Sequence, residues 1–79
     1  MSNHQPSAST HLFRDSAEQL ALRLEQEPSE IAVGLAREAR ELAGRFAAWQ
    51  TDRPTDDVRV ATIGRLFELN RRALDYLAG

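Results

Sequence analysis

Apolar residues recur every three or four positions along most of this chain, and two short polar breaks divide the pattern into three segments. The breaks are Glu27-Pro28-Ser29 and Thr51-Asp52-Arg53-Pro54. Proline pushes the residue before it out of helical geometry, and serine or threonine next to it caps the helix that follows. We therefore predict an all-α protein of three helices with short connections.

The first segment predicts a helix with one narrow apolar stripe, running from near Thr10 or His11 to Gln26. At 4-3-4 spacing, the stripe contains Phe13, Ala17, Leu20 and Leu24. Residues 1–10 are polar and contain almost nothing to bury, so they are expected to form a disordered tail. The remainder, residues 11–79, is expected to be a single three-helix domain.

The second segment, from Glu30 to Gln50, predicts a helix with two adjoining contact surfaces. Its large residues form a ridge on one side, made of Ile31, Leu35, Leu42, Phe46 and Trp49. Beside the ridge runs a row of small residues, the alanine row, made of Ala32, Ala36, Ala39, Ala43 and Ala47. Small side chains let another helix approach closely, so we expect a neighbour on each surface.

The third segment predicts a helix over residues 56–78, with Thr55 as its N-cap and two aspartates in its first turn. Six residues cover about 100° of its circumference: Val58, Leu66, Leu69, Ala73, Tyr76 and Leu77. Four more widen the arc to about 200°, and they are Val60, Ile63, Phe67 and Leu74. An arc of this width is too broad for one neighbour, so this helix needs at least two partners.

These helices are expected to form a small antiparallel bundle, in which a short first helix packs on a long hairpin of the second and third helices. Either one chain closes a three-helix bundle, or the hairpin pairs with a second copy. We favour the homodimer, because the first helix would span about 22 Å against about 32 Å for the other two and so leave part of the hairpin uncovered.

The expected interface comprises the outer part of the wide arc, the alanine row and one polar residue inside the arc. Its members are Val60, Ile63, Phe67, Leu74, Asn70, Ala32, Ala36, Ala39 and Ala43. Because a buried amide is costly without a partner, we expect Asn70 to pair with its symmetry mate and fix the register.

Composition narrows the chemistry available to the protein. The 79 residues include no cysteine and only two histidines, His4 and His11, which we expect to bind no metal. All ten basic residues are arginine, as in proteins from GC-rich bacterial genomes. The first residues do not show the pattern of a signal peptide, which is a basic region followed by an apolar run. No stretch reaches the ~20 apolar residues of a membrane span, so a cytoplasmic protein without membrane contact is expected.

No spacing of nucleophile, acid and base or metal ligands is present in the long helical segments, so we expect no enzyme activity, no cofactor and no small-molecule substrate. The predicted function is helix-mediated protein–protein interaction, as a homodimeric adaptor, co-chaperone or regulator that binds another chain through its apolar helix face. The alternative is a nucleic-acid-associated regulator that uses arginine-rich helix faces. We regard it as second, because acidic residues share those faces and the net charge is -2.

Overall fold

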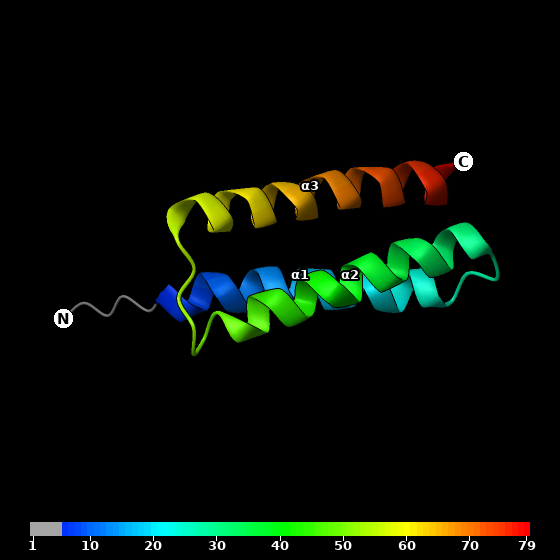
Figure 1. Ribbon diagram of the computed structural model, residues 1–79. Coiled ribbons are helices and arrows are strands. Elements are labelled where there is room, and N and C mark those ends of the chain that lie inside the picture. Colours follow the sequence, from blue (N-terminus) through cyan, green and yellow to red (C-terminus); the bar gives the residue numbers. More distant parts are fainter. Residues whose placement is uncertain (1–5) are drawn as a thin grey trace.

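The computed structural model describes residues 6–79, with side chains from His11 onward. Over this range the chain forms three helices and no strand: α1 (Pro6–Glu25), α2 (Glu30–Ala48) and α3 (Asp56–Ala78). Figure 1 shows α1 and α2 side by side, with α3 lying along one side of that pair. The prediction of an all-α chain with three helices is confirmed.

Helix α1 packs mainly on α2, and small side chains are buried on both helices. On α1, Ala17 and Ala21 have no exposed surface. On α2, four members of the alanine row are buried: Ala32, Ala36, Ala39 and Ala43. Alanines on both sides allow the two backbones to approach closely, which explains why α1 and α2 form the tightest part of the molecule.

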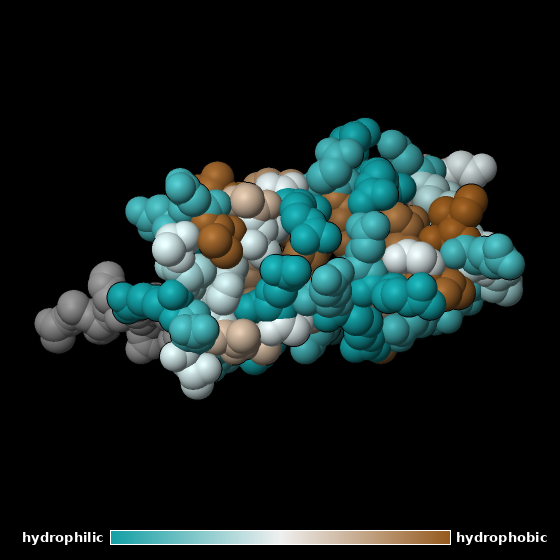
Figure 2. All heavy atoms as spheres, viewed as in Figure 1, coloured by the Kyte–Doolittle hydropathy of each residue, from teal (hydrophilic) through white to brown (hydrophobic). Residues whose placement is uncertain are grey.

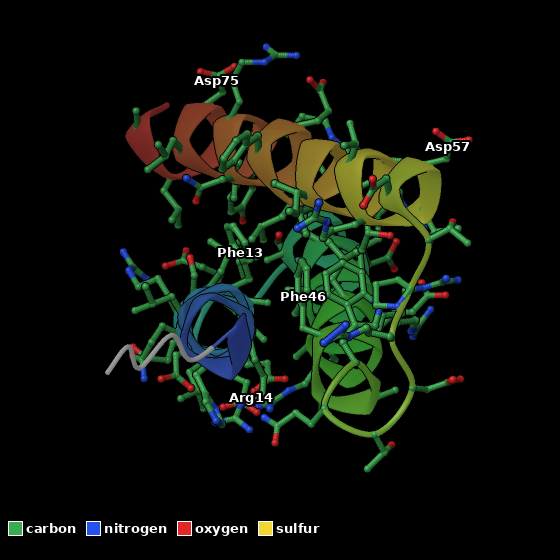
Figure 3. All side chains as sticks on the ribbon, turned by 90° about the vertical axis from the view of Figure 1, so that its left-hand side faces the viewer. Phe13, Arg14, Phe46, Asp57 and Asp75 are labelled. Carbon is green, nitrogen blue, oxygen red and sulfur yellow. The ribbon has the colours of Figure 1, made fainter. Side chains whose placement is uncertain are left out.

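Helix α3 closes the core from one side of this pair. Its buried residues are Thr62, Leu66, Leu69 and Ala73. They cover the large side chains buried on the other two helices, namely Leu24, Leu35, Leu42 and Phe46. Figure 3 shows α3 crossing the pair obliquely, with Phe13 and Phe46 pointing into the space beneath it. One face of α3 is therefore covered along its middle, whereas Val58 and Val60 near its start are exposed.

Three aromatic rings fill the core near the end of α2. The rings of Phe13 and Phe46 stack with their centroids 5.5 Å apart. Trp49 meets Phe46 edge to face, with centroids 5.0 Å apart, and is itself half-buried. This cluster closes the end of the core that faces the connection to α3.

The helix starts follow the capping chemistry expected from the sequence. The Ser29 hydroxyl accepts a hydrogen bond from the backbone N–H of Ala32 at 3.1 Å, and the Thr55 hydroxyl accepts one from Val58 at 3.3 Å. Ser29 also shares a hydrogen bond of 2.5 Å with the hydroxyl of Tyr76, near the end of α3. One side chain thus caps α2 and holds α3 in place.

The first helix differs most from the sequence expectation. It begins at Pro6 rather than near Thr10 or His11, so the predicted disordered tail overlaps α1 over residues 6–10; the rest of that prediction falls on residues 1–5, outside the described residues. With 20 residues, α1 is as long as α2, which has 19. The length mismatch that favours a dimer is therefore absent.

A second difference concerns the ridge of large residues on α2. The sequence pattern includes Ile31 in this ridge, but 64% of its surface is exposed. Ile31 lies in the first turn of α2. Helical periodicity fixes the direction of a side chain and not how far along the helix its neighbours extend.

Candidate interaction face

The candidate site is an apolar surface on α3, which we call the α3 strip. Its members are Val60, Ile63, Phe67 and Leu74. Val60, Phe67 and Leu74 are 68%, 63% and 58% exposed, and Ile63 is half-buried at the edge of the core. In Figure 2, apolar patches interrupt the polar surface over α3 and along the boundary between α3 and the other helices.

The strip is exposed because α3 has more apolar surface than the α1–α2 pair covers. Thr62, Leu66 and Leu69 point into the core, whereas Val60 and Phe67 lie about a third of a turn away around the helix. Full burial of a large apolar side chain stabilises a fold by about 1.5–3 kcal/mol. A side chain that stays more than half exposed contributes only the smaller part of this free energy. The α3 strip is therefore a candidate interaction surface.

The other half of the predicted interface lies elsewhere in the molecule. The alanines at positions 32, 36, 39 and 43 are buried within a single copy, where α1 packs on α2. A second copy would have to displace α1 to reach them. The structure therefore brings together the residues predicted on α3 but separates them from those predicted on α2.

Asn70 lies beside the α3 strip and is exposed. Among the side chains from His11 onward, none forms a hydrogen bond with its amide. The pairing of Asn70 with a symmetry mate thus remains a prediction about an assembly, and within one copy the amide is open to solvent.

The opposite flank of α3 is polar and holds a shallow depression of about 440 Å³, which opens between α2 and α3. It is lined by Glu38, Ala61, Gly64, Arg65, Glu68 and Arg72. Arg72 donates to Glu38 at 2.8 Å, and Arg71 donates to Glu68 at 2.5 Å. The two arginines and two glutamates of the lining balance in charge, so the depression offers no net attraction to an anion.

The arginine faces are similarly neutralised. Of the seven arginines on α2 and α3, five form ion pairs with carboxylates: Arg40, Arg45, Arg59, Arg71 and Arg72. A phosphate would have to compete with these carboxylates for the guanidinium groups, which weakens the case for nucleic-acid binding.

The strongest of these pairs joins the end of α1 to the middle of α2. Arg40 donates two hydrogen bonds to Glu25, from Nε to Oε2 and from Nη2 to Oε1, both at 2.8 Å. These hydrogen bonds lower the pKa of the Glu25 carboxyl below its ordinary value of 4.5; desolvation acts in the opposite direction, and the charge of Arg40 adds a further lowering. Sequence analysis did not identify this pair, because Glu25 and Arg40 lie on different helices and 15 positions apart.

We expect Arg40→Gln to raise the pKa of Glu25 toward 4.5 in a carboxyl NMR titration. A folded-state pKa below the unfolded value means that the pair stabilises the fold above the unfolded pKa and that this contribution is lost as the pH falls through the folded pKa. The difference in thermal midpoint between the wild type and Arg40→Gln should therefore be present at neutral pH and shrink as the pH falls below the ordinary value of 4.5. Arg45→Gln, on an exposed pair within α2, is the control; a Glu25 titration that Arg40→Gln leaves unchanged would contradict the assignment.

Comparison with protein-family models, with curated proteins and with solved structures found no match for this chain. In the range that the structure describes, no group of three or more His, Asp or Glu side chains is placed to hold a metal ion. None of the three described helices has the length and apolar character needed to cross a membrane. The α3 strip is therefore the feature on which a functional argument rests.

Proposed function

We propose that this chain is a non-enzymatic helical protein of the bacterial cytoplasm that acts through helix-mediated protein–protein interaction, with the α3 strip as its binding surface. The observation that carries the proposal is the exposure of Val60, Phe67 and Leu74 along one line of a helix whose other face is already buried in a closed core. A helix that presents an apolar line of this kind binds by packing against another helix or into a groove.

The proposed assembly is a homodimer, in which the strips of two copies cover one another. A two-fold interface uses the same surface on both partners, so one exposed strip per chain is sufficient. Within each copy we infer that α2 and α3 run antiparallel, and the hydrogen bond between Ser29, before α2, and Tyr76, near the end of α3, supports this arrangement. A dimer that retains part of its apolar surface would serve as an adaptor, co-chaperone or regulator.

The mass in solution tests the homodimer directly. We expect sedimentation equilibrium of the full chain to show the 8.9 kDa monomer at low concentration and a rise toward twice that mass as the concentration approaches about 1 mM. A constant monomer mass over that whole range would refute the homodimer. A probe of duplex DNA or of RNA at low salt, expected to remain unbound, separates this proposal from the nucleic-acid alternative.

A further inference from the structure

We draw no further inference here: the strongest candidate, the exposed apolar surface patch formed by Val60, Phe67 and Leu74 on α3, belongs to the interaction face already described, and nothing in the structure shows what covers it.

Discussion

Replacing Phe67 by glutamate is expected to keep the chain monomeric at about 1 mM, where the wild type approaches the mass of a dimer, while leaving the fold of each copy intact. Phe67 is the central large side chain of the α3 strip and is 63% exposed within one copy, so its removal takes little from the monomer core. In the dimer, an ionised carboxylate at this place would have to lose its water against apolar neighbours. Sedimentation equilibrium measures the loss, and circular dichroism measures the retained helix.

Val33→Glu is the matched control for this substitution. Val33 is also an exposed apolar residue, but it lies on α2 and outside the strip. It should leave the dissociation constant within about twofold of the wild type, since it changes net charge by the same amount without touching the contact. If both variants weakened association equally, net charge would be the cause and the α3 strip would not be the interface. Unfolding of Phe67→Glu would instead place Phe67 in the monomer core.

The largest loss of stability is expected from Phe46→Ala, at about 3–5 kcal/mol. Phe46 has no exposed surface, stacks with Phe13 and meets Trp49 edge to face, so removing its ring takes both aromatic contacts from the core. A domain of 79 residues has a total stability of about 4–12 kcal/mol, which means that much of this variant should be unfolded at 37 °C.

Phe67→Ala provides the comparison, because it deletes the same atoms from an exposed position. Measured by urea unfolding at a concentration below dimerisation, it should change the free energy of unfolding by less than about 1 kcal/mol. A loss from Phe46→Ala no greater than that from Phe67→Ala would mean that the aromatic cluster does not hold the helices together.

Local chemistry made the helices predictable. Ser29 and Thr55 cap α2 and α3 as expected, because a hydroxyl oxygen next to a helical segment satisfies a backbone N–H that nothing else reaches. The wide apolar arc of α3 likewise predicted that this helix needs at least two partners, and in one copy Val60 and Phe67 are exposed. These features depend on residues close together in sequence.

The placement of α1 was not predictable in the same way. The alanine row of α2 indicated that some helix would approach closely, but only the matching alanines at positions 17 and 21 identify α1 as that helix. Residues 6–10 have little to bury, and their helical conformation continues the helix that the apolar stripe begins. The oblique crossing of α3 depends on how the side chains of all three helices pack together, and no local sequence signal predicts it.

The two roles of Ser29 have a consequence for how the molecule comes apart. Its hydroxyl satisfies the first turn of α2 and, on its other side, bonds to Tyr76. If α3 separated from the rest of the molecule, the Ser29 hydroxyl would be exposed to water, and the first turn of α2 would become less stable. Separation of α3 is thereby coupled to fraying of α2. This coupling favours cooperative unfolding of the whole chain over an intermediate in which α3 has separated while α1 and α2 remain packed.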